Sequence, residues 1–360
     1  MVKKIRIPAI LLMGILALSC KQNAIFYAIS QEVEPVDPKI AGMPTNIVKL
    51  GDIVYVASRF SGKILKYSGG AWSDLDQQPG GKILELAATA NNLYALAGDP
   101  GSAVVSRYDG AAWQTLTADG NLQVIYAAEE YVFAGAMSGS SFDILYAKDD
   151  ENSLTSLKTG TKLLKGAAFL NDVYYLATSG DGILTFRDGS IQDDPVGIKD
   201  KESAKIIVTG IITVKDTVVA VSRGDILYGP VDGKFTAASG GVVFTGGLGL
   251  WENDDASVKL LLLGIQGGSS STSHGYREIV LNADGTLITT LNADGTSTTN
   301  TTLNNPGGEK STITNVDKYN SSLRRHPVIG FLQAPDKILF ASTTKDGLWA
   351  YRNEVWNAEQ

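Results

Sequence analysis

A hexapeptide that recurs four times is the feature of this chain that most restricts its fold. The copies are YSGGAW (67–72), YDGAAW (108–113), FRDGSI (186–191) and YRNEVW (351–356). Each copy begins and ends with a large apolar residue and has turn-forming residues at its centre. A two-residue hairpin loop there places the first and last residues opposite each other on one face of a sheet. Four such hairpins spread over the chain predict a repeated all-β unit.

The spacing of the strand-like segments gives the size of this unit. Segments such as IVYVA (53–57) and LYALA (93–97) are almost uninterrupted runs of Val, Leu, Tyr and Ala, as expected for strands covered on both faces. Their central residues follow one another at intervals of 39 to 45 residues, with 78 before the last: Tyr55, Tyr94, Phe133, Tyr174, Val219, Leu261 and Leu339. Four short strands in about 40 residues, without helical periodicity, are typical of the blades of a β-propeller.

We therefore predict an all-β fold, a seven-bladed β-propeller of four-stranded antiparallel blades, over residues 44–360. Six or eight blades are the alternatives, because the hairpins of the third and fifth repeats are weaker. The last strand, Glu354–Trp356, is expected to be the fourth strand of blade seven, which leaves Ala24–Ser30 either to flank the ring or to complete the last blade. The aromatic ends of the hairpins, Trp72, Trp113 and Trp356, are expected to pack between blades.

The long interval before the last repeat predicts an insertion in blade six at about 292–324. Two tandem segments, LNADGTLITT and LNADGTSTTN, begin at Leu281 and Leu291. The first Asn-Ala-Asp-Gly is expected to be the turn between the third and fourth strands of this blade. The second copy and the Asn/Thr/Gly-rich stretch up to Thr312 form either a protruding hairpin or a disordered loop.

The first twenty residues have the pattern of an export signal. Three basic residues, Lys3, Lys4 and Arg6, precede an apolar run that ends at Leu18. This run is shorter than the roughly 20 residues that a membrane-spanning helix needs, and small Ser19 follows it. No later apolar run is long enough to cross a bilayer.

Cys20 is the only cysteine of the 360 residues and stands directly after this signal. The segment Ala17-Leu18-Ser19-Cys20 resembles the lipobox of bacterial lipoproteins, and in particular that of spirochaetal ones, which tolerate Ala17 and Leu18 at these positions. The resemblance implies a signal peptide over 1–19 and lipidation of Cys20, with palmitate among the attached chains. An ordinary secretory signal with an incidental cysteine is the alternative.

The resemblance also implies a location and a membrane partner. The protein would be exported and anchored by its lipid to a bacterial membrane, either on the periplasmic side or at the cell surface. Residues 20–43 would then form a tether containing one possible strand, Ala24–Ser30.

The charge of the exported chain excludes one class of partner. Without the three basic residues of the signal, 28 Lys and Arg remain against 38 Asp and Glu, a net charge of −10. An acidic surface repels phosphate backbones. We therefore expect no nucleic-acid partner.

The candidate binding face follows from propeller geometry. The loops between the second and third strands emerge on the same side of the ring as the connections into the next blade. Binding residues are found on loops more often than on strands. On this face we predict the binding residues Arg59, Phe60, Met137, Phe142, His274, Arg324, Arg325 and His326.

Motifs that would indicate catalysis or a cofactor are missing from the sequence. The two histidines, His274 and His326, lack the close Cys, His or carboxylate spacing of a metal site. No GxSxG motif accompanies the serine-rich loop before His274. Acidic pairs such as Asp149-Asp150 are interpreted as solvated loop charges rather than as acid/base pairs. We predict no metal and no cofactor.

Three hypotheses for function follow. The first is a non-enzymatic platform, lipid-anchored in the cell envelope, that binds another envelope protein. The second is a small-ligand or glycan binder that uses the central opening or loop aromatics such as Phe60 and Phe142. The third is a hydrolase or lyase at the mouth of the channel. The combination of signal and repeats resembles spirochaetal lipoprotein propellers, and this resemblance implies the fold but no activity.

Overall fold

The recurring hexapeptides form the outer hairpins of four-stranded sheets. The computed structural model describes residues 40–192, 195–199, 203, 205–231, 233–239, 242–266, 275–287, 290–291, 297–298, 316–317, 323 and 327–359. In each hexapeptide the first and last residues are direct cross-strand partners: Tyr67 with Trp72, Tyr108 with Trp113, Phe186 with Ile191 and Tyr351 with Trp356. The three aromatic pairs have ring centroids 5.1 to 5.2 Å apart. This confirms the pairing predicted from the sequence.

Seven four-stranded antiparallel sheets, the blades, follow one another along the chain. Blade one is β1 (Val48–Leu50), β2 (Ile53–Ala57), β3 (Ile64–Ser68) and β4 (Ala71–Asp74), and blade two is β5 (Ile83–Ala88), β6 (Leu93–Ala97), β7 (Val104–Tyr108) and β8 (Trp113–Thr115). Blade three is β9 (Asn121–Ala128), β10 (Tyr131–Ser138), β11 (Ser141–Lys148) and β12 (Thr155–Thr161). Blade four is β13 (Leu164–Leu170), β14 (Val173–Thr178), β15 (Ile183–Arg187) and β16 (Ser190–Ile191).

The remaining three blades include the one with the insertion. Blade five is β17 (Val208–Val214), β18 (Thr217–Ser222), β19 (Asp225–Val231) and β20 (Lys234–Ser239). Blade six is β21 (Phe244–Glu252), β22 (Lys259–Ile265), β23 (Gly275–Val280) and β26 (Val316–Asp317), and β24 (Thr290–Leu291) pairs with β25 (Ser297–Thr298). Blade seven is β27 (Val328–Gln333), β28 (Leu339–Thr343), β29 (Leu348–Arg352) and β30 (Val355–Ala358).

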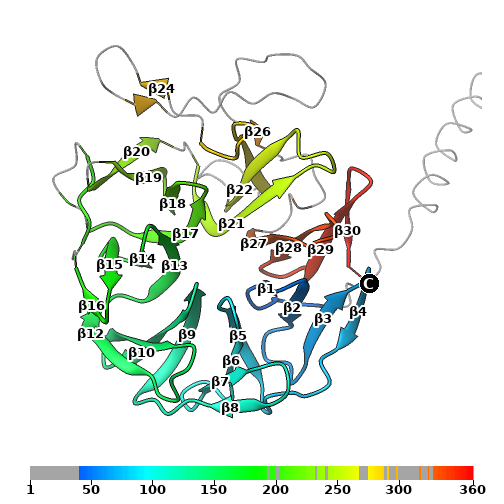
Figure 1. Ribbon diagram of the computed structural model, residues 1–360, viewed down its shortest axis with the longest axis vertical. Helices are drawn as coiled ribbons and strands as arrows, with labels where there is room; N and C mark the ends of the chain where they lie inside the picture. The colour runs from blue at the N-terminus through cyan, green and yellow to red at the C-terminus, as the bar shows by residue number, and fades with distance from the viewer. Residues whose placement is uncertain are drawn as a thin grey trace, which may run out of the picture. The chain divides into compact units, whose positions relative to one another are not determined.

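The blades stand around a ring with the first strand of each innermost (Figure 1). The predicted seven-bladed β-propeller is thus confirmed. We call the side of the ring that carries the loops between second and third strands the loop face. The connections into the next blade's first strand reach the same side. The opposite side, with the turns between first and second and between third and fourth strands, is the turn face.

The core consists of clusters that join neighbouring blades. The indole of Trp72 lies 5.2 Å, centroid to centroid, from the ring of Phe340 in blade seven. Trp356 donates its indole N–H to the Tyr276 hydroxyl of blade six at 3.1 Å. Trp113 donates its indole N–H to the Gln77 carbonyl at 3.0 Å. The tryptophans of the hexapeptides therefore pack between blades, as predicted.

Glycine allows the first strands of blades five, six and seven to approach closely. Gly246 has a φ of +94°, in the left-handed region that L side chains rarely adopt. A Cβ at this position would collide with the Thr209 carbonyl oxygen of blade five, and one at Gly247 would collide with the Val328 carbonyl oxygen of blade seven.

Each blade takes its four strands from its own repeat, so the first and last blades share no strand. The segment before β1 closes the ring instead, through hydrogen bonds to blade seven and blade one. The Leu348 and Gly347 N–H groups of blade seven donate to the Ile40 and Gly42 carbonyls at 3.1 and 2.8 Å. The Arg59 N–H of blade one then donates to the Met43 carbonyl at 2.8 Å. The buried side chain of Ile40 packs into the cluster shared by blades one and seven. β30 is the fourth strand of blade seven, as expected.

Blade six differs from the prediction in the position of its insertion. The first Asn-Ala-Asp-Gly forms a local turn, in which the Gly285 N–H donates to the Asn282 carbonyl at 2.8 Å and Leu281 bridges Leu287. The fourth strand comes much later, at β26, which pairs with β23. The connection that carries the insertion therefore joins the third and fourth strands, and its ends at Val280 and Val316 lie at the turn face.

Candidate functional site at the mouth of the central channel

A cavity of about 210 Å³ lies on the axis of the ring. Its walls come from the first strands of all seven blades or from the residues just before them, among them Val48, Leu86, Tyr126, Lys165, Ile211, Leu248 and Ile329. Apart from Lys165, the lining carries no charged residue. Most side chains in the wall are thus apolar, with a single ammonium group among them, although polar atoms make up the larger part of the exposed surface.

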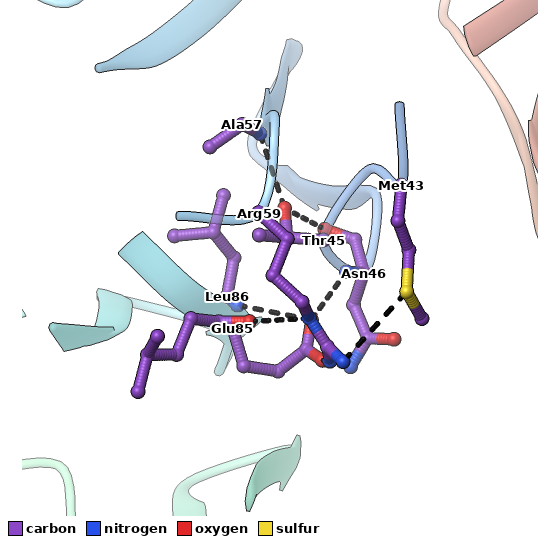
Figure 2. A network of polar contacts seen from close by, with 8 residues as sticks. Met43, Thr45, Asn46, Ala57, Arg59, Glu85 and Leu86 are labelled. Carbon is purple, nitrogen blue, oxygen red and sulfur yellow. Dashed lines mark hydrogen bonds and ion pairs between the residues drawn. The ribbon is translucent and has the colours of Figure 1, made fainter. Parts of the chain in front are cut away.

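Arg59 follows β2 on the loop face of blade one, and its side chain points toward Glu85 of blade two, beside the cavity residue Asn46 (Figure 2). Its guanidinium forms an ion pair with Glu85, and its Nε donates to the Leu84 carbonyl at 3.0 Å. Its other terminal nitrogen lies 3.9 Å from the Met43 sulfur. The sequence predicted Arg59 as a binding residue of an exposed face. The structure shows that most of its donors are used by neighbouring residues.

Glu85 is a buried carboxylate, only 5% exposed, in the first strand of blade two. Burial raises its pKa, and the Arg59 guanidinium and the backbone N–H groups of Asn46 and Leu86 oppose this shift. The Asn46 and Leu86 N–H groups both donate to its Oε1 (Figure 2). Hydrogen bonds from this many donors stabilise the carboxylate as an anion in an ion pair. They also leave it less available to accept a proton as a general base.

Lys165, at the second position of β13, has no hydrogen bond or ion pair within the described part of the chain. Burial lowers the pKa of its ammonium, and the positive Arg59 guanidinium lowers it further. Tyr126 of blade three lines the same cavity, and burial raises the pKa of its phenol, with a further contribution from Glu85. Lys165 and Tyr126 therefore line the cavity, and the Arg59–Glu85 ion pair lies close enough to shift the pKa of each.

The remaining described residues of the predicted face are apolar and at the surface. Phe60 is 56% exposed, with a φ of +68°, and Met137 is 47% exposed. Met137 is the cross-strand partner of half-buried Phe142 in the hairpin of blade three. The structure thus separates the predicted set into an inward-pointing arginine and an outward-pointing apolar group.

Most of the exposed large apolar side chains of the described residues lie at the loop face. They are Phe60, Val104, Met137 and Ile207, on blades one, two, three and five. Two others, Leu250 and Val355, lie toward the turn face. The loop face is thus the more apolar of the two faces by this measure.

Several predicted residues lie outside the described part of the chain. These are Cys20, His274, Arg324, Arg325 and His326. Within the described residues, no group of three or more His, Cys, Asp or Glu side chains is placed to hold a metal ion. No helix in the same part of the chain is long and apolar enough to span a membrane.

The sequence analysis interpreted Asp149 as a solvated loop charge, but in the structure its carboxylate is hydrogen-bonded to another blade. Its carboxylate accepts hydrogen bonds from the Thr89 and Tyr94 hydroxyls, at 2.6 and 2.9 Å, and from the Asn91 amide at 3.0 Å. All three donors belong to blade two, whereas Asp149 follows the third strand of blade three. Asp149 therefore links two blades.

Sequence analysis missed Glu85 and Lys165, although a signal was present. Both are charged residues inside short apolar first strands, ILELAA (83–88) and LKGAAFL (164–170). A charge at such a position is seldom left without a partner or a role. The pattern could not show that both strands line the same channel.

Comparison with known proteins supports the fold. No family model and no curated protein matches the sequence. The WD40 propeller domain of Doa1 superposes with a TM-score of 0.56 at 12% identity, over 88% of this chain and 95% of that one. A chain of the mitotic checkpoint complex gives a TM-score of 0.54 at 12% identity, over 92% of this chain and 96% of that one.

A bacterial structure is also similar. The extracellular domain of BT4673 from B. thetaiotaomicron gives a TM-score of 0.52 at 11% identity and covers 89% of this chain. The chain spans only 40% of the BT4673 chain. Identities this low indicate a shared fold and leave the activity open. The chain is therefore a seven-bladed β-propeller whose loop face and channel mouth carry its candidate functional groups.

Proposed function

We propose that this protein is a non-enzymatic interaction platform of the bacterial cell envelope, anchored by lipid at Cys20, that binds another protein with its loop face. The observation that carries the proposal is that four exposed large apolar side chains, Phe60 and Met137 the most exposed of them, lie at that face and only two lie toward the other. Contact of apolar side chains with water is unfavourable, so covering them with a partner lowers the free energy. Rigid blades present them on short loops, so that little conformational entropy is lost on binding.

Site-specific photocrosslinking tests the surface. A benzophenone amino acid is placed at position 60 or 137, with position 355 as the control, because Val355 is also exposed but lies toward the turn face. Crosslinking in intact cells should give a protein adduct of defined mass at 60 and 137 and none at 355. Adducts at all three positions, or at none, would count against the loop face.

Substitution gives an independent measurement of the same surface. The Phe60→Glu and Met137→Glu changes together should abolish the adduct formed by a crosslinker placed at the neighbouring exposed position 104. The matched Val355→Glu variant should leave that adduct intact. Because all these side chains are exposed, the variants should fold normally, with stability within about 0.5 kcal/mol of the parent.

The anchor is tested separately. Metabolic labelling with a palmitate analogue should mark the wild-type protein, and Cys20→Ser should lose both the label and the membrane association. A Cys20→Ser protein that stays in the membrane fraction would refute the lipid anchor without bearing on the interaction surface.

A further inference from the structure

The charges of the channel do not balance. Arg59 and Glu85 form an ion pair at the mouth, and this leaves the Lys165 ammonium without a counter-charge in the described part of the channel. A partly buried ammonium close to a second cation is unfavourable, because it loses hydration and is repelled. A desolvated charge with a charged neighbour in a cleft marks a candidate functional site.

Donors and space are available for an anion beside Lys165. The Tyr126 hydroxyl has no hydrogen-bond partner among the described residues, and Tyr126 and Lys165 line the same cavity of about 210 Å³. The other walls near Lys165 are apolar or glycine, including Gly166, Ile211 and Leu248. One uncompensated positive charge and one phenol donor match a ligand with one negative charge, and the side chains of Ile211 and Leu248 offer contacts to a short apolar body.

We propose that the channel cavity binds a small monocarboxylate. Its carboxylate pairs with the Lys165 ammonium and accepts a hydrogen bond from the Tyr126 hydroxyl. Its apolar part lies against Ile211 and Leu248. This site is separate from the loop-face surface proposed above, so that either proposal can fail without the other.

Calorimetric titration of the full chain tests the site. The probes are acetate, butyrate and benzoate, with phosphate and chloride as inorganic anions, all at one ionic strength and at neutral pH. We expect saturable binding of butyrate or benzoate with one site per chain, tighter than acetate because of the apolar walls. Binding of the inorganic anions alone, or of no probe up to about 10 mM, would overturn the proposal.

Two lysine variants localise the binding. Lys165→Met keeps the length of the side chain and removes the charge, and should weaken carboxylate binding about tenfold or more. Lys162→Met removes the same charge from an exposed lysine three residues away and should leave binding unchanged. Equal weakening in both variants would mean a general charge effect and would contradict the site.

The Glu85→Gln variant should bind the carboxylate probes more tightly, whereas Lys165→Met should bind them more weakly. The amide keeps an acceptor for the Asn46 N–H but removes the negative charge beside the cavity, so that carboxylate binding should tighten. This measurement keeps the proposal testable if Lys165→Met fails to fold. Unchanged or weaker binding in a folded Glu85→Gln protein would overturn the electrostatic argument.

Discussion

Replacing Asp149 with alanine should destabilise the ring more than replacing its neighbour Asp150. Two donors of the Asp149 carboxylate, the Thr89 and Tyr94 hydroxyls, belong to buried side chains, and Tyr94 is 0% exposed. Thr89 keeps a second acceptor, the Asn92 carbonyl at 3.3 Å. No second acceptor for the Tyr94 hydroxyl is found among the described residues, and Asp149→Ala would leave it buried without one.

The magnitude follows from these contacts. A hydrogen bond to a charged group contributes about 1.5 kcal/mol or more to stability, so loss of two such bonds from buried donors should cost about 3 kcal/mol. Tyr94→Phe removes one of them and should cost about 1.5 kcal/mol. The double variant should cost about 3 kcal/mol instead of the sum, because the two changes remove the same bond.

Equilibrium urea denaturation followed by tryptophan fluorescence measures this cycle. The midpoint should fall at an unchanged slope, since the surface exposed on unfolding is the same. Asp150→Ala is the control: Asp150 is exposed, and its loss should change stability by less than about 0.5 kcal/mol. Strictly additive costs for Asp149→Ala and Tyr94→Phe would refute the assigned hydrogen bond, and a neutral Asp149→Ala would refute the link between blades.

Two further predictions concern the packing and the titration of the ring. Gly246→Ala should destabilise the protein by about 3 kcal/mol or more, because the new Cβ meets the Thr209 carbonyl oxygen and φ is positive. Gly224→Ala, where a Cβ meets open space, should leave the melting temperature almost unchanged; similar losses in both would contradict the close approach. Burial and the hydrogen bond to Asp336 raise the pKa of Tyr67 to about 12. The stability that this group contributes is therefore fully present below about pH 10 and is lost as the pH rises through about 12. Melting curves of wild type and Tyr67→Phe between pH 8 and 12 should converge, and a constant difference would exclude a raised pKa.

The ring could be predicted from the sequence because the features that indicate it, the hairpin turns and the strand spacing, lie within each repeat. A hairpin such as Tyr67–Trp72 is determined by the turn residues at its centre, and the spacing of the second strands follows from the length of one blade. The fourth strand of blade six could not be found in this way. Val316–Asp317 is two residues long and lies in a polar stretch without alternation, so only its pairing with β23 defines it as a strand.

The channel site was beyond prediction for a different reason. Arg59 and Glu85 come from different blades, and Lys165 comes from a third. Alternation within each strand separates buried from exposed positions, but cannot tell which of them face the ring axis when both faces are covered. Likewise, Asp149 looked like one of several loop acids because its three donors lie about 55 to 60 positions away in the sequence.

The way the N-terminal segment closes the ring determines how the molecule would respond to force. Tension applied from the N-terminal side would reach the described part of the chain first at Ile40, whose carbonyl accepts a hydrogen bond from the Leu348 N–H of blade seven. The next bonds along the chain, at Ala41, Gly42 and Met43, would then take the load one after another. Few hydrogen bonds would share the tension at any moment, and each break would loosen the seam between the last blade and the first. Tension from the N-terminal side and opening of the seam between the last and first blades would thus be coupled at the same few residues.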